Sequence, residues 1–110
     1  MPAIENRNRE IEAYLNETPL ELIDVEGSLV PFFNLQKHKK LHSHSSMTGA
    51  KAALRYSQFP FVALTTDGET MSLRSRPDGV DVAIVATSLG GGGHPNAAGY
   101  SFNRLSRREK

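Results

Sequence analysis

The spacing of apolar residues predicts a short helix at the start of the chain. Ile4, Ile11 and Leu15 form a thin stripe in an otherwise polar segment. Pro19 ends this pattern, because proline cannot continue a helix and restricts the residue before it. A stripe this narrow fills little of a core. Residues 1–18 are therefore interpreted as a connector helix that packs against another element.

The middle of the chain predicts strands, a helix and a hairpin. Residues 20–35 favour two short strands around a Glu26-Gly27 turn, and residues 45–57 favour a helix. The face of that helix expected to pack on the core consists of Met47, Ala50 and Leu54. Its expected N-cap is Ser45 or Ser46. The apolar run 61–64 predicts a strand buried on both faces, and Asp67-Gly68 supplies the turn that follows it.

The strand after this turn carries two arginines. Alternation places Met71 and Leu73 on one face, and a polar set on the other. That polar set is Ser72, Arg74 and Arg76. Two guanidinium groups and a hydroxyl are therefore expected to project together.

The last third of the chain predicts a helix and a final strand. Val82, Val85, Ala86 and Leu89 recur at helical spacing, with Asp81 as the expected N-cap. A run of four glycines follows, then a strand from about residue 97 to residue 102. The order of elements predicts one small domain of the α/β class, a mixed-sheet α/β sandwich.

Composition narrows the classes of protein and partner. The 110 residues carry a formal charge of +1 and no cysteine, so a disulfide framework and a thiolate zinc site are excluded. No apolar run approaches the roughly 20 residues of a membrane span, so no membrane partner is expected. The polar N-terminus favours a cytoplasmic location. The basic tail, residues 104–110, is interpreted as a solvated end.

The glycine run Gly90–Gly93 is longer than a helix cap requires. One glycine commonly ends a helix, as Gly90 is expected to do here. The others can expose backbone N–H groups that form an anion-binding nest. His94 and Arg74 then supply a hydrogen-bond donor and a bidentate partner for phosphate.

These motifs resemble one known family. Residues 72–76 ("SLRSR") and 81–100 ("DVAIVATSLGGGGHPNAAGY") are similar to the DHH-associated C-terminal domain of DHH phosphoesterases, including oligoribonuclease- and exopolyphosphatase-like members. The resemblance covers roughly residues 20–102, and residues 19–103 are assigned to this substrate-binding domain. It implies that the domain holds nucleotide or short-oligonucleotide substrates. The implied contact residues are Arg74, Ser75, Gly91, Gly92, Gly93 and His94, with Arg76 at lower weight.

The family's catalytic half has no counterpart in this sequence. That half binds two metals, usually manganese, through aspartates and an Asp-His-His motif that this chain lacks. The chain alone is therefore not expected to be an enzyme, to bind a metal or to need a cofactor. Its expected partners are a DHH catalytic domain, in cis or in trans, or a second copy of itself. The alternative is a stand-alone RNA-binding module similar to the C-terminal domain of alanyl-tRNA synthetases.

A basic, histidine-rich segment allows three interpretations. Its charged residues are Lys37, His38, Lys39, Lys40, His42 and His44. It is interpreted as a basic loop near the substrate, as a solvated loop, or as a metal site formed by the three histidines. The metal site is the weakest of the three, because no carboxylate or cysteine lies nearby.

Overall fold

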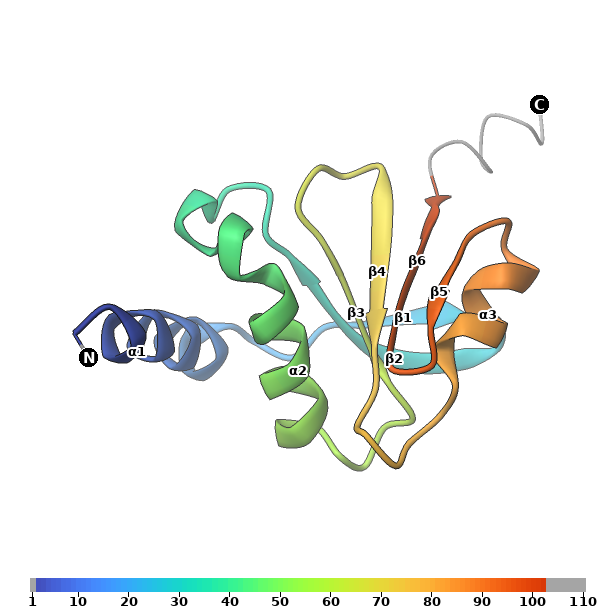
Figure 1. The fold of residues 1–110 in the computed structure, drawn as a ribbon, viewed down its shortest axis with the longest axis horizontal. Coiled ribbons are helices and arrows are strands. Elements are labelled where there is room, and N and C mark those ends of the chain that lie inside the picture. Colours follow the sequence, from blue (N-terminus) through green and yellow to red (C-terminus); the bar gives the residue numbers. More distant parts are fainter. Residues whose placement is uncertain (1, 103–110) are drawn as a thin grey trace.

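The computed structural model describes residues 2–102 and shows an α/β sandwich (Figure 1). This confirms the expected fold class. A six-stranded mixed sheet has the order β1-β2-β3-β4-β6-β5. The elements are α1 (Pro2–Glu17), β1 (Leu22–Val25), β2 (Ser28–Asn34), the 3-10 turn η1 (Lys39–His44), α2 (Ser45–Arg55), β3 (Val62–Thr65), β4 (Thr70–Arg74), α3 (Val82–Ser88), β5 (Gly92–His94) and β6 (Ala97–Ser101). The tail 104–110 lies outside the described residues.

Turn chemistry at the expected positions closes the hairpins. Glu26 and Gly27 have φ of 52° and 88° between β1 and β2, and Gly68 has φ of 77° between β3 and β4. Positive φ favours the glycines at these points. β2 and β3 are parallel and are joined through η1 and α2, whereas the other neighbouring strands are antiparallel. Among residues 2–102, no helix has the length and apolar character needed to cross a membrane.

Two hydrophobic clusters lie on opposite faces of the sheet. The cluster under α1 and α2 contains Ile11, Tyr14, Leu15, Phe33, Leu35, Leu41, Ala52, Ala53, Val62 and Leu64. The cluster under α3 contains Val25, Val30, Phe61, Ala63, Met71, Leu73, Val82, Ala86, Ala98 and Tyr100. Alternation along β3 sends successive side chains to different clusters, so this strand is buried on both faces, as the sequence predicts.

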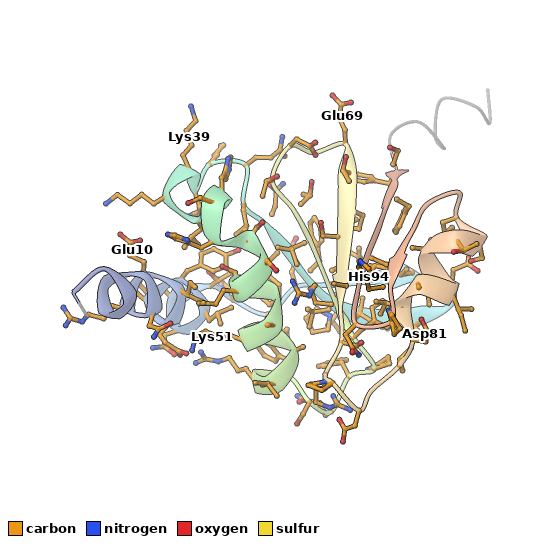
Figure 2. The ribbon with its side chains drawn as sticks, in the orientation of Figure 1. Glu10, Lys39, Lys51, Glu69, Asp81 and His94 are labelled. Carbon is orange, nitrogen blue, oxygen red and sulfur yellow. The ribbon has the colours of Figure 1, made fainter. Side chains whose placement is uncertain are left out.

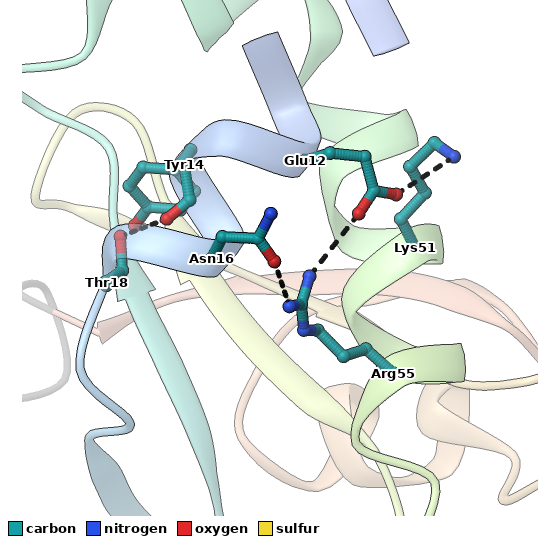
Figure 3. Close-up of polar contacts among 6 residues, drawn as sticks. All are labelled: Glu12, Tyr14, Asn16, Thr18, Lys51 and Arg55. Carbon is teal, nitrogen blue, oxygen red and sulfur yellow. Dashed lines mark hydrogen bonds and ion pairs between the residues drawn. The ribbon is translucent and has the colours of Figure 1, made fainter. Parts of the chain in front are cut away.

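Helix α1 packs into the first cluster instead of presenting an unmatched stripe. Ile11 and Leu15 are buried there, and so is Tyr14, which the sequence pattern did not single out. Tyr14 widens the apolar stripe enough to contact the Phe33 ring at a centroid distance of 6.2 Å. On the outer side, Glu12 forms ion pairs with α2 (Figure 3). The connector helix is therefore part of the domain core.

The predicted packed face of α2 is right at Met47, which packs against the first cluster, and wrong at Leu54. Its buried residues are Thr48, Gly49, Ala52 and Ala53, whereas Leu54 is 61% exposed. Small residues on the inner face let the helix approach the sheet closely. The N-cap prediction is also wrong: His44 holds that position without a side-chain cap bond.

Candidate functional site

A hollow lies between the start of α2 and strands β4, β6 and β5. Its volume is about 310 Å³, near the lower end of the range for small-molecule sites. We call it the Arg74 hollow, and its lining is Ser45, Ser46, Leu64, Ser72, Arg74, Gly92, Ala97, Ala98 and Gly99. Small and hydroxyl side chains predominate, so the floor is shallow and the backbone is accessible.

Strand register explains why these residues meet. Residues paired across neighbouring strands share one face of a sheet. One row across β3, β4, β6 and β5 consists of Leu64, Ser72, Gly99 and Gly92. The next row consists of Val62, Arg74, Ala97 and His94. On β3 this face of the sheet buries large apolar side chains. On β4 and β5 the same register rows carry the Ser72 hydroxyl, the Arg74 guanidinium and the His94 imidazole.

Arg74 is the central polar residue of the hollow. Its Nε donates to the Asn96 carbonyl over 3.2 Å, and its Nη1 donates to the Ser46 carbonyl over 2.9 Å and also to the Ser46 hydroxyl. Burial lowers the pKa of the Arg74 guanidinium, but arginine stays protonated in proteins. A fixed, half-buried positive charge therefore borders the hollow.

Among the side chains that the structure describes, those of residues 8–102, no carboxylate pairs with this charge. The contacts of Arg74 go to carbonyl and hydroxyl oxygens, while Lys51 and Arg55 of α2 form ion pairs with Glu12. A partly desolvated cation is costly unless an anion compensates it. The hollow is suited to an anionic group.

The first two glycines of the run end helix α3. Gly90 has φ of 91°, and its N–H donates to Thr87 O over 3.1 Å. The Gly91 N–H donates to Ala86 O over 2.8 Å. These two bonds form a Schellman cap. The Gly91 amide is therefore occupied within the fold, and the expected open nest does not form at this residue.

The next two glycines belong to strand β5, not to a loop. Gly92 and Gly93 pair with Gly99 and Ala98 of β6. A Cβ on Gly93 would lie 2.5 Å from Ala98 Cα, whereas a Cβ on Gly92 would meet nothing within 4 Å. Gly93 is thus required for packing. Gly92 leaves open space over the hollow.

His94 ends β5 in the same register row as Arg74. Ala97 lies between them on β6, so their Cα atoms are two strand spacings apart, about 10 Å. His94 is exposed, at the position labelled in Figure 2. An anion or a flat ring over Ala97 could contact both side chains.

Ser75 and Arg76 do not line the hollow. Ser75 is 6% exposed, and its hydroxyl donates to Val80 O over 2.6 Å. Arg76 lies beyond the end of β4 and donates to Ser57 O over 3.0 Å and Phe59 O over 3.4 Å. Arg76 thus bonds to carbonyl groups just after the end of α2, whereas Arg74 bonds to Ser46 at the start of that helix.

Asn96 connects these elements and was missed by the sequence analysis. Its side-chain Nδ2 donates to Ser75 Oγ over 3.0 Å and to Arg76 O over 2.7 Å. Its backbone carbonyl oxygen accepts from Arg74 Nε. The β5–β6 turn is thereby fixed to the end of β4. The sequence clue to Asn96 was its position in the "HPNAAG" stretch. Its hydrogen bonds reach residues 74–76, which lie 20 or more positions earlier in the chain.

The basic segment lies beside a different hollow. Lys37, Lys39 and Lys40 line a space of about 540 Å³ against α1, together with Glu10 and Glu17. Figure 2 shows Lys39 well apart from His94. The interpretation as a loop near the substrate is thus not supported for the lysines.

Two histidines of this segment, His38 and His42, have side chains that contact different parts of the fold. The His42 Nε2 lies 2.7 Å from Leu35 O, and the His38 ring lies 4.8 Å from the Tyr14 ring. Within residues 2–102, no group of three or more His, Asp or Glu side chains could hold a metal ion. The described residues therefore do not fit the manganese pair that the family resemblance implies for its catalytic half.

Comparisons with known proteins support the fold and leave the family open. No family model matches the chain. An uncharacterized protein of Acanthamoeba polyphaga mimivirus is 49% identical over 43 residues, which are 39% of this chain and 10% of that protein. The crystal structure of an uncharacterized protein from Helicobacter pylori is similar with a TM-score of 0.59 at 14% identity, over 94% of this chain and 30% of that one. The chain spans less than a third of the length of either protein.

Proposed function

We propose that the Arg74 hollow binds the phosphate of a nucleotide or short oligonucleotide. The observation that carries this proposal is the half-buried Arg74 guanidinium, which has carbonyl and hydroxyl partners but no carboxylate among the described side chains of residues 8–102. A bound phosphate neutralises the positive charge of this guanidinium and accepts charge-assisted hydrogen bonds from it. The bare Gly92 leaves room for the sugar or base beside it, and His94 lies in the same register row as Arg74.

The resemblance to DHH-associated domains gives this binding a wider role. On that basis the chain is the substrate-binding part of a DHH-family phosphoesterase. Phosphodiester hydrolysis is assigned to a separate manganese-binding domain, in cis or in trans, because the described residues offer no metal site. This chain's own contribution is to bind and orient the substrate. A cytoplasmic location stays an expectation from the sequence.

Calorimetric titration with a 5′-phosphorylated dinucleotide tests the binding. Arg74→Ala is expected to lower affinity by about 10- to 100-fold, the range for losing hydrogen bonds to a charged group. His94→Ala is expected to lower it less, because His94 is exposed. Circular dichroism should show that both variants fold.

Arg76→Ala is the matched control, because it removes the same charge from a side chain that lies outside the hollow. Its affinity is expected to fall clearly less than that of Arg74→Ala, because the Arg76 guanidinium bonds to Ser57 O and Phe59 O and does not line the hollow. Equal affinity of the Arg74→Ala variant and the original chain would contradict the proposal. Tighter binding of folded tRNA than of the dinucleotide would favour the RNA-binding module instead.

A further inference from the structure

Gly49, in the middle of α2, lies directly against Arg74. A Cβ at this position would lie 2.5 Å from Arg74 Cγ, 3.3 Å from Arg74 Cβ and 3.0 Å from Leu64 Cδ2. Glycine inside a helix is less favourable than alanine, so this position has a packing reason. The atoms in the way belong to the base of the arginine side chain. They cannot move without changing the direction of the whole side chain.

Because Gly49 has no Cβ, the side chain of Arg74 has room to pass α2 and reach the hollow. The side chain of Arg74 passes under Gly49, and its guanidinium reaches Ser46 one helical turn earlier. From the other side, Nε donates to Asn96 O. These contacts use Nε and Nη1, and within the described residues Nη2 makes no hydrogen bond. The guanidinium is thus held by two elements with one nitrogen left for a ligand.

We propose that Gly49 is a positioning residue for the phosphate site. Its bare backbone lets α2 close over Arg74, which fixes the guanidinium at the edge of the hollow. Preorganisation of this kind increases affinity, because the side chain does not have to be ordered on binding. The inference rests on the proposed function for its ligand, but its structural step concerns Arg74 alone.

A double-mutant cycle between Gly49→Ala and Arg74→Ala tests the structural step. Alone, Gly49→Ala is expected to lower the melting temperature, despite the better helix propensity of alanine. On the Arg74→Ala background the closest clash, with Cγ, is gone and the tight contact with Leu64 Cδ2 remains, so the same change is expected to lower the melting temperature much less. Lys51→Ala, on the outer side of α2, is the control and should behave alike in both backgrounds. Equal losses from Gly49→Ala in both would overturn the inference.

The Arg74 side-chain Nε–H resonance gives a second readout without a ligand. In the original chain this proton is expected to exchange slowly with water, and in Gly49→Ala at least tenfold faster. An unchanged resonance would overturn the inference even if the variant binds poorly. Affinity for the 5′-phosphorylated dinucleotide is then expected to fall about tenfold in Gly49→Ala, whereas adding Gly49→Ala to Arg74→Ala should lower it no further than Arg74→Ala does alone. Failure of the original chain to bind the dinucleotide contradicts the proposed function, and the cycle and resonance still decide the role of Gly49.

Discussion

Two halves of one sheet face have opposite characters. Under α1 and α2, strands β2 and β3 present Phe33, Val62 and Leu64, each no more than 1% exposed. On the same face, strands β4, β6 and β5 present Ser72 and Gly92 in register with Leu64. One row of paired residues thus runs from core to hollow.

Side-chain size along this row decides where the helices can cover the sheet. α2 packs on the half with large apolar side chains, and its first turn borders the other half. The small side chains leave backbone and Arg74 accessible there, while hydrogen bonding within the sheet is unbroken. The stable half therefore acts as a scaffold for the accessible half.

The largest effect is expected from the covered half. Phe33→Ala should lower the free energy of unfolding by about 3–5 kcal/mol, the usual range for truncating a buried phenylalanine. Its ring contacts those of Tyr14 and Tyr56, so a cavity would open between two helices and the sheet. Urea denaturation measures the change. Leu29→Ala, at a 57% exposed position, is the control, and a loss below about 1 kcal/mol at Phe33 would contradict its core role.

An intermediate loss of stability is expected at Gly93. Its φ of 146° is rarely adopted by L residues, and a Cβ would contact Ala98 Cα. Gly93→Ala should therefore cost about 2 kcal/mol of unfolding free energy. Thermal or urea unfolding measures it. A neutral substitution would show that β5 does not have this geometry.

The neighbouring glycine should separate stability from binding. Gly92→Ala is expected to change unfolding free energy by less than about 0.5 kcal/mol, since the added methyl meets no atom within 4 Å. The methyl enters the hollow, so affinity for the dinucleotide should fall about fivefold, or about 1 kcal/mol. Calorimetry on the Gly92 and Gly93 variants gives the comparison. Unchanged binding by the Gly92 variant would indicate that the ligand lies elsewhere.

The smallest effect concerns the turn that joins the two halves. Backbone hydrogen bonds from Thr70 and Glu69 lower the pKa of Asp67 below its ordinary value of 3.8. A depressed pKa stabilises the fold above the unfolded-state value, and that stability is lost as pH falls through the folded-state value. Melting temperatures between pH 7 and pH 3 should show a slightly shallower decline in Asp67→Ala. The effect is small because the carboxylate is exposed.

Local chemistry could be predicted from the sequence. The Glu26-Gly27 and Asp67-Gly68 turns form where predicted, and the Asp81 side chain accepts from the Ala83 N–H at the start of α3. Gly90 ends that helix as expected. Each of these signals acts over a few residues, so it needs no knowledge of the tertiary fold.

Long-range contacts could not be predicted in this way. The sequence pattern placed Arg76 beside Arg74, but β4 ends at Arg74, and the two guanidinium groups bond to carbonyls at opposite ends of α2. Likewise, the role of Gly49 depends on how closely α2 approaches the sheet, and that of Asn96 on a contact between two turns. Tertiary packing determines the contacts of these residues, and the local pattern of apolar and polar residues does not predict which distant elements pack together.

The most direct test of phosphate binding in the Arg74 hollow is an NMR titration with a 5′-phosphorylated dinucleotide. It follows the chemical shifts of backbone amides and of arginine side chains. The largest shifts are expected at Ser46, Ser72, Arg74 Nε and Gly92, with smaller shifts at Gly91, whose amide already bonds to Ala86 O. Inorganic phosphate should move Arg74 Nε and Ser46 but leave Gly92 less affected. Shifts confined to the lysine segment, or none at millimolar dinucleotide, would contradict binding at this site.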